Sequence, residues 1–339
     1  MKLSILDQVR LTDGMTASRA LRSSLELARL GDELGYERYW VAEHHGSEST
    51  VCPCPEVLLG RIGAETSEIR IGAGGVLLPH YSPLKVAESF RTLDALYPGR
   101  IDLGIGRSPG CGIQEMHALR RYRSDSPFAE DFEEQLTDLL RFLNGDFPKD
   151  HQFRNIIVSP STQRRLPVWL LGSTCSSAAI AGKLDLSYAY AQFICPTQMQ
   201  DAFERYRELR NGSAGNQSRT ILAVSVICTE SEDEIHKLAL SVKKNRPPPN
   251  GGAQNNGVPA LPRKQWEKCR FVGTPERVQH EIYAAAAIAK TEEVMILTPL
   301  ADHETCMKSY RLLAEIFGLK SRSKADANPR ASTEQAFKV

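Results

Sequence analysis

Short apolar segments alternate with longer amphipathic segments along most of the chain. Eight of the short segments are bounded by charges, Gly or Pro, as β-strands usually are. The predicted strands are residues 3–7, 37–42, 69–76, 101–106, 167–172, 186–191, 221–228 and 293–298.

The segments between these strands have the spacing of helices with one buried face. In the first of them, Leu21, Leu25 and Ala28 fall on one side, and Gly35 is expected to end the helix in the left-handed conformation. The predicted helices are residues 17–34, 55–66, 83–96, 129–143, 176–183, 198–210, 232–243, 275–290 and 304–317.

The repeated order of strand and helix predicts parallel strands joined by right-handed crossovers. Eight such units fit an α/β fold, the (β/α)8 TIM barrel, which takes about 250 residues plus insertions. A doubly wound open sheet is the alternative, but the first strand is not followed by a dinucleotide fingerprint. We expect one domain over residues 1–319, a mobile loop at residues 245–257 after the seventh strand, and a disordered tail at residues 320–339.

The composition indicates in which compartment the protein resides and which classes of partner it does not bind. The chain has 339 residues, 41% of them hydrophobic, and its net charge of +1 at pH 7 offers no general attraction to nucleic acid or membranes. It contains no apolar segment long enough to span a bilayer and no signal-peptide core, so we expect a cytoplasmic protein. Its eight cysteines would then be thiols, and Cys52 and Cys54 lack further zinc ligands at suitable spacing, so no metal is expected.

Titratable side chains end the second predicted strand. Glu43, His44 and His45 directly follow its apolar residues. The carboxyl ends of parallel strands form the mouth of a barrel, where enzymes of this fold keep their chemistry, and histidine exchanges protons near neutral pH. We expect at least one imidazole to work in a site; the alternative is a helix cap or a surface residue.

Glycines and one arginine mark the ends of the next two strands. The glycines at residues 72–75 indicate either a backbone that approaches a flat ligand or tight packing between helix and sheet. Arg107 follows the fourth strand, where its planar guanidinium suits a phosphate or a carboxylate. A structural salt bridge under a loop explains Arg107 equally well.

A run of small hydroxyl residues follows the fifth strand, which ends at Gly172. Free N–H groups and the helix dipole make such a helix start an anion site, although plain capping by Ser173 or Thr174 explains the same residues. Arg107 and this turn follow adjacent strands at the same end of the barrel. We therefore expect them to share one phosphate.

Four of these segments, in the same order, resemble the bacterial luciferase-like flavin monooxygenases. The segments are residues 42–45, 74–83, 98–107 and 169–173. The resemblance covers most of residues 3–318 and is greatest for the single-chain luciferase-like oxidoreductases, rather than for the subunits of the light-emitting heterodimer. It implies a (β/α)8 barrel that uses reduced FMN and O2.

The resemblance also implies which residues bind the flavin. The pair Gly74–Gly75 would lie along the isoalloxazine, where the family has a non-prolyl cis peptide. The groups implied to hold the phosphate are those of Arg107, Gly172, Ser173 and Ser176.

The resemblance implies a different role for each of the two histidines. His44 matches an imidazole that luciferases need for catalysis and would act as acid or base near the flavin C4a-peroxide. His45 would pair with Glu88 at a subunit contact, because members of the family form homodimers through the helices after the second and third strands.

We therefore interpret the chain as a flavin-dependent monooxygenase. It would use O2 and reduced FMN, supplied by a separate reductase, to oxidise a small, aldehyde-like organic substrate through a C4a-peroxyflavin. Hydride transfer with F420, or a non-catalytic flavin-binding accessory role, are the alternatives, and the retained His44 argues against the accessory role. Residues 152–165 and 245–257 match no motif of the family, so the substrate is not specified.

Overall fold

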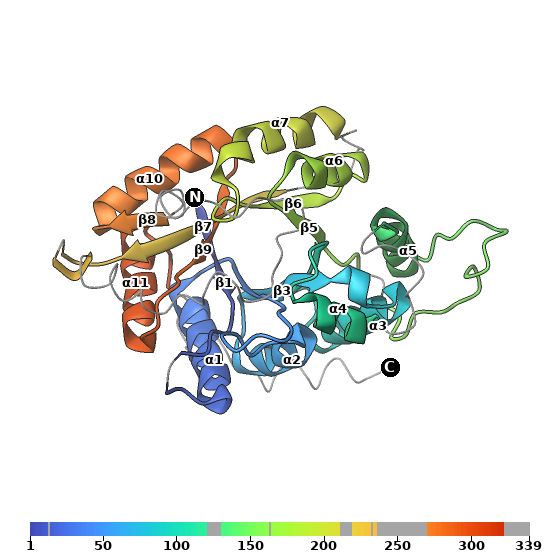
Figure 1. Cartoon of the computed structure of the whole chain (residues 1–339), viewed down its shortest axis with the longest axis horizontal. Coiled ribbons are helices and arrows are strands. Elements are labelled where there is room, and N and C mark those ends of the chain that lie inside the picture. Colours follow the sequence, from blue (N-terminus) through green and yellow to red (C-terminus); the bar gives the residue numbers. More distant parts are fainter. Residues whose placement is uncertain are drawn as a thin grey trace.

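The computed structural model describes residues 1–12, 14–120, 130–162, 164–210, 219–231, 233–235 and 270–321. Eight parallel strands close into a barrel, because β6 pairs with β7, β7 with β9, and β9 with β1 (Figure 1). The strands of the barrel are β1 (Lys2–Asp7), β2 (Arg38–Val41), β3 (Arg70–Leu77), β4 (Ile101–Gly106), β5 (Val168–Gly172), β6 (Ser187–Ala191), β7 (Thr220–Cys228) and β9 (Glu293–Leu297).

The predicted (β/α)8 barrel is confirmed, and so are all eight predicted strands. The strand at residues 101–106 has the predicted bounds, and the others differ by one residue at one or both ends. A further strand, β8 (Arg270–Gly273), was missed by the sequence analysis. It pairs with the second half of β7, from Ser225 to Cys228, whereas β9 pairs with the first half.

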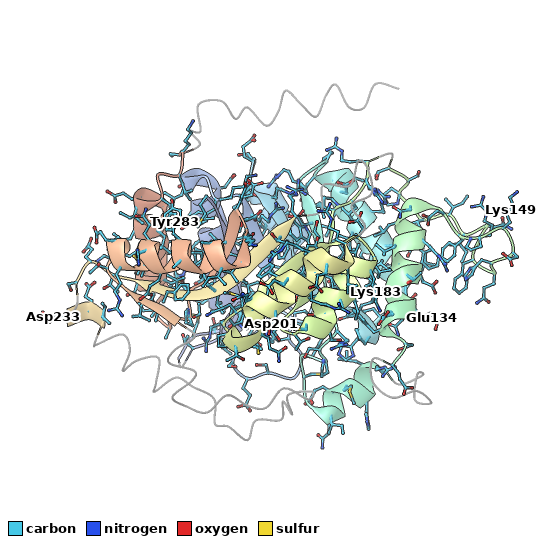
Figure 2. The ribbon with its side chains drawn as sticks, turned by 90° about the horizontal axis from the view of Figure 1, so that it is seen from above. Glu134, Lys149, Lys183, Asp201, Asp233 and Tyr283 are labelled. Atoms are coloured by element: carbon cyan, nitrogen blue, oxygen red, sulfur yellow. The ribbon has the colours of Figure 1, made fainter. Side chains whose placement is uncertain are left out.

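Helices surround the barrel (Figure 1). They are α1 (Ala17–Leu34), α2 (Pro55–Glu65), η1 (Leu78–His80), α3 (Pro83–Leu96), α4 (Ile113–Leu119), α5 (Phe132–Asn144), α6 (Cys175–Lys183), η2 (Pro196–Gln198), α7 (Met199–Leu209), α10 (Pro275–Ala289) and α11 (His303–Ile316). Figure 2 shows the charged side chains of Glu134, Lys183 and Asp201 on the outer sides of α5, α6 and α7, where all three are exposed.

Local sequence signals explain where several helices begin and end. The hydroxyl of Thr16 accepts a hydrogen bond from the N–H of Arg19 at 3.2 Å and caps α1, and Gly35 ends the helix with φ 84°, as predicted. Helix α4 was not predicted; none of its residues is buried, and its apolar residues Ile113, Met116 and Leu119 span only two turns. The predicted loop at residues 245–257, residues 322–339 of the predicted tail, and all but residues 233–235 of the predicted helix at 232–243 lie outside the described residues. The first two tail residues are described, and Ser321 Oγ donates to the carbonyl of Glu33 at 3.0 Å.

A buried ionic cluster occupies the interior of the barrel near the amino ends of its strands. Arg38 has no exposed surface, and its guanidinium lies 2.7 Å from Asp102 Oδ2 and 2.5 Å from Glu293 Oε1. Burial alone would lower the pKa of Arg38, but the two carboxylates more than offset this and raise it. Arg70 lies 2.6 Å from the second oxygen of Asp102, and the indole N–H of Trp40 donates to Asp102 at 3.2 Å. The cluster therefore joins strands β2, β3, β4 and β9.

Replacing Arg38 with Ala would leave Asp102 and Glu293 buried without their shared cation. We expect Arg38→Ala to lower the free energy of unfolding by about 3–5 kcal/mol, the usual effect of removing one partner from a buried ion pair. Urea denaturation would measure the change. As a control, Lys85→Ala removes an exposed ion pair with Glu88 and should change stability by less than about 1 kcal/mol. Equal effects of the two substitutions would contradict the structural role of the cluster.

Candidate active site

The residues predicted to form the site lie at the carboxyl ends of four neighbouring strands. His44 follows β2, Gly74–Gly75 lies in β3, Arg107 follows β4, and Gly172–Ser173 ends β5. These strands are parallel and pair in this order, so their ends open on one rim of the barrel.

The structure brings Arg107 next to the first turn of α6. Nη1 of Arg107 lies 3.4 Å from Oγ of Ser176, and both side chains are exposed. Within the described residues, Arg107 forms no ion pair with a carboxylate. The alternative of a structural salt bridge therefore has no partner there, and an exposed guanidinium remains beside a hydroxyl and the start of a helix. This donor set suits a phosphate.

The start of α6 is held firmly against β5. Thr174 caps the helix by accepting a hydrogen bond from the N–H of Ser177 at 3.4 Å, so the capping alternative is present as well. A Cβ on Gly172 would overlap the side chain of Ser177, which explains the glycine at this position. The hydroxyl of Tyr190 donates to the carbonyl of Ser173 at 3.1 Å and fixes the preceding turn.

Gly74–Gly75 is a non-prolyl cis peptide, as the resemblance implied. A Cβ on Gly74 would lie 2.8 Å from Leu6 Cδ1, and one on Gly75 would lie 2.8 Å from the backbone of Gly104. The Gly104 backbone leaves no room for a side chain at position 75, whereas at position 74 the nearest atom is the end of the flexible Leu6 side chain. The atoms that limit both positions lie in neighbouring strands, so these contacts are not the packing between helix and sheet that was the alternative.

His44 is half-buried at this rim. Burial lowers its pKa, the Glu43 carboxylate partly opposes this shift, and the neighbouring His45 and Arg10 lower the pKa further. Its Nδ1 is buried and has no hydrogen-bond partner in the described part of the chain. The imidazole is therefore neutral near pH 7 and has a nitrogen available for proton transfer.

The carboxylate of Glu43, to which the sequence analysis gave no role, lies at the centre of a buried hydrogen-bond network. Its Oε1 accepts hydrogen bonds from Tyr81 Oη and His45 Nε2, both at 2.7 Å, and its Oε2 accepts one from the N–H of Leu77 at 3.2 Å. We expected His45 to pair with Glu88 at a subunit contact. Within the chain its carboxylate partner is Glu43, because both follow the same strand, whereas Glu88 on α3 lies 3.9 Å from Lys85.

The same network connects the loops that carry His44 and Arg107. The N–H of His45 donates to the carbonyl of Gly110 at 3.2 Å. His80 Nε2 lies 2.7 Å from the carbonyl of Pro109, and since a carbonyl only accepts, this nitrogen carries the proton. The loop after Arg107 is therefore tied to the loops after β2 and β3.

Sequence reasoning missed the roles of Tyr81 and His80 in this network. Both residues lie in the segment 74–83 that carried the resemblance, and two polar aromatic side chains directly after a buried strand were the available signal. The bracing role of Tyr190 had no such signal, because this residue lies inside an apolar strand.

In the described residues, no group of three or more His, Cys, Asp or Glu side chains is arranged to hold a metal ion. None of the helices in this part of the chain has the length and apolar composition of a membrane span.

Comparison with known proteins identifies the family. The family model described as luciferase-like monooxygenase matches residues 1–298. The chain therefore belongs to the luciferase-like monooxygenases, a family of oxidoreductases. It is 34% identical over 333 residues to the N-acetyl-S-alkylcysteine monooxygenase of Bacillus subtilis, an alignment that covers 93% of this chain and 98% of that protein.

Two solved structures have the same fold over nearly the whole chain. The crystal structure of apo-MsnO8 is 39% identical with a TM-score of 0.82 and covers 95% of this chain and 99% of that one. The oxygenating constituent of 3,6-diketocamphane monooxygenase from Pseudomonas putida was solved in complex with FMN. It is 18% identical with a TM-score of 0.71 and covers 93% of this chain and 97% of that one.

The lowered pKa of His44 has a consequence for stability. As the pH falls below about 6.5, the ordinary pKa of histidine, the unfolded chain takes up a proton at this position before the folded chain does. We therefore expect His44 to lower the free energy of unfolding as the pH falls below that value, and to leave it independent of pH above it. Urea denaturation at several pH values should therefore give a shallower acid slope for His44→Gln than for the wild type. His280→Gln, an exposed change on α10, is the control, and a slope unchanged in His44→Gln would contradict the shift.

Proposed function

We propose that the protein is a flavin-dependent monooxygenase that uses reduced FMN and O2 to oxidise a small organic substrate. The observation that carries the proposal is the exposed Arg107 guanidinium, which has no carboxylate partner among the described residues and lies 3.4 Å from Ser176 Oγ at the start of α6. It lies on the same rim as the neutral imidazole of His44, so a site for a phosphate and a group for proton transfer occur together.

The residues at this rim fit FMN in their chemistry. Arg107, the hydroxyl of Ser176 and the first turn of α6 supply donors for a phosphate, and Ser173 and Gly172 form the turn that leads into the helix. The FMN found in the diketocamphane monooxygenase constituent supports this choice of flavin. Gly74–Gly75, which has no side chains, would take the isoalloxazine as the resemblance implies.

Reduced FMN would supply the electrons that activate O2 for insertion of one oxygen atom into the substrate. The protein's own residues would hold the cofactor, exclude water and move a proton. His44 has a free Nδ1 and a lowered pKa, so it would act as the acid or base at the reacting centre. Glu43, His45 and Tyr81 would position it through the loops that they join.

The partners follow from the same proposal. A separate reductase would supply the reduced FMN, because the first strand carries no dinucleotide fingerprint. Two copies of the chain would associate through α2 and α3, where the apolar side chains of Val57 and Leu96 are 71% and 60% exposed.

A direct assay tests the proposed activity. We expect the protein, mixed with chemically reduced FMN and isotopically labelled O2, to place one labelled atom in at least one member of a panel of aldehydes and N-acetyl-S-alkylcysteines, as mass spectrometry would detect. His44→Ala should abolish the product while flavin binding is retained, because this side chain does not hold the phosphate. Flavin binding with no product from any compound would support the accessory alternative. Tighter binding of F420 than of FMN would favour hydride transfer instead.

Arg107→Ala tests the phosphate site. We expect the Kd for reduced FMN to rise roughly 10- to 100-fold, as loss of a charge-assisted hydrogen bond predicts, and the Kd for reduced riboflavin to stay nearly constant. Anaerobic fluorescence titration would measure both. Arg205→Ala on α7, which removes only an exposed pair with Glu208, is the matched control. Equal weakening of both flavins by Arg107→Ala would mean that the guanidinium does not contact the phosphate.

A further inference from the structure

Two buried tyrosines of β6 lie against the turn that leads into α6. Tyr188 and Tyr190 are two residues apart in the strand, so they point to the same side of it, and neither has any exposed surface. Strand β6 pairs with β5 in such a way that Tyr190 lies opposite Gly172, the last residue of β5. The two hydroxyls can therefore reach the residues that follow Gly172, which form the turn before the helix.

The hydroxyl of Tyr190 lies between the loops after β5 and β6. It is 3.1 Å from the carbonyl oxygen of Ser173 and 2.5 Å from that of Cys195. A hydroxyl has a single proton, so the two carbonyls share one donor. Burial raises the pKa of Tyr190 well above its ordinary value, so the hydroxyl keeps this proton at neutral pH. Tyr190 therefore joins the turn before α6 to the turn after β6.

Tyr188 holds the next carbonyl of the same turn. The carbonyl oxygen of Thr174 accepts the hydroxyl of Ser177 at 2.8 Å and lies 3.3 Å from the hydroxyl of Tyr188. The two hydroxyls are 3.0 Å apart, so one of them donates to the other and the second proton goes to the carbonyl. The carbonyls of Ser173 and Thr174 therefore both face buried tyrosines.

The directions of these two carbonyls determine where the following N–H groups point. The peptide bonds after Ser173 and Thr174 are trans, and in a trans peptide the C=O and the next N–H point in opposite directions. The N–H groups of Thr174 and Cys175 therefore face away from the tyrosines, towards the surface. In agreement with this, the N–H of Cys175 lies 3.4 Å from Oε1 of the exposed Gln198.

Arg107 approaches the same turn of the main chain. Its Nη1 lies 3.4 Å from the hydroxyl of Ser176, the residue after Cys175. Backbone N–H groups at a helix start bind phosphate only when they point at it. The orientation of the peptide units at residues 173–175 therefore decides whether they and Arg107 can bind the same group. Loss of a tyrosine hydroxyl would free these units to rotate without removing any group that contacts the phosphate.

We propose that Tyr190, assisted by Tyr188, is a positioning residue of the flavin phosphate site, because its hydroxyl orients the main chain at residues 173–175 so that the N–H groups face the phosphate held by Arg107. This inference rests on the proposed flavin-dependent function and adds two residues that do not contact the ligand themselves. The preference for FMN over riboflavin then depends on the orientation of the main chain as well as on the charge of Arg107.

The packing of the two tyrosines allows their hydroxyls to be removed alone. The ring of Tyr190 lies 5.7 Å from that of Phe203, and the ring of Tyr188 stacks on that of Tyr206 at 5.4 Å. A phenylalanine at either position would keep these contacts. Tyr206 is the matched control, because its buried hydroxyl donates to the carbonyl of Leu186 at 2.7 Å, just before the amino end of β6 and away from the turn.

The test compares three single hydroxyl deletions with the wild type. Anaerobic fluorescence titration would give the Kd for reduced FMN and for reduced riboflavin, and urea denaturation would give the stability. We expect Tyr190→Phe to raise the Kd for FMN roughly 3- to 10-fold, as loss of one hydrogen bond predicts, with the Kd for riboflavin nearly constant. Tyr188→Phe should cause a smaller rise, because Ser177 still donates to Thr174. Tyr206→Phe should lower the stability as much as Tyr190→Phe does and change neither Kd.

The possible failures can be told apart. If Arg107→Ala removes the preference for FMN while Tyr190→Phe keeps it, or if Tyr190→Phe weakens both flavins equally, the positioning role of Tyr190 is overturned and the phosphate site stands. A wild type that binds FMN and riboflavin equally contradicts the phosphate site itself, and the inference with it. A selective loss of FMN binding in Tyr190→Phe, without oxidation of any compound by the wild type, supports the positioning role and contradicts the monooxygenase activity instead.

Discussion

The barrel depends most on the two ion pairs that the buried guanidinium of Arg38 forms. This guanidinium is fully enclosed and neutralised by Asp102 and Glu293, so it bridges β2, β4 and β9 through the centre of the molecule. Charges in such a place are tolerated only when each is paired and hydrogen-bonded. The ring of Trp169 lies under the guanidinium at 4.9 Å and closes the cluster towards the barrel interior. The amino end of the barrel is thereby fixed, and the opposite rim is left for loops.

Glu43 joins the loops at the carboxyl end of the barrel, as Arg38 joins the strands at the amino end. One buried carboxylate accepts hydrogen bonds from the loops after β2 and β3, and His45 and His80 extend the network to the loop after β4. The distance between Arg107 and His44 is therefore set by paired polar groups rather than by loop packing alone. This precision matters for an enzyme, because a reacting group displaced by about 1 Å loses much of its effect.

The sequence predicted the fold and the location of the site better than the contacts within it. Apolar strands and amphipathic helices have strong periods, so the eight strands and the position of Arg107 near Ser176 followed from order alone. Helix α4 and strand β8 give only weak signals, because α4 is short and buries nothing and β8 is a four-residue strand that pairs only with the end of β7. The Glu43 network depends on side-chain directions and on residues distant in the chain, which a single sequence does not specify.

The segment around Arg10 is attached to the loop after β2 through its main chain. Residues 9–11 are joined to residues 49–51 by backbone hydrogen bonds, so the anchor does not depend on which side chain occupies position 10. The main chain of this segment would therefore keep its path whichever side chain stands at position 10, and a substitution there would change only the charge at this part of the rim.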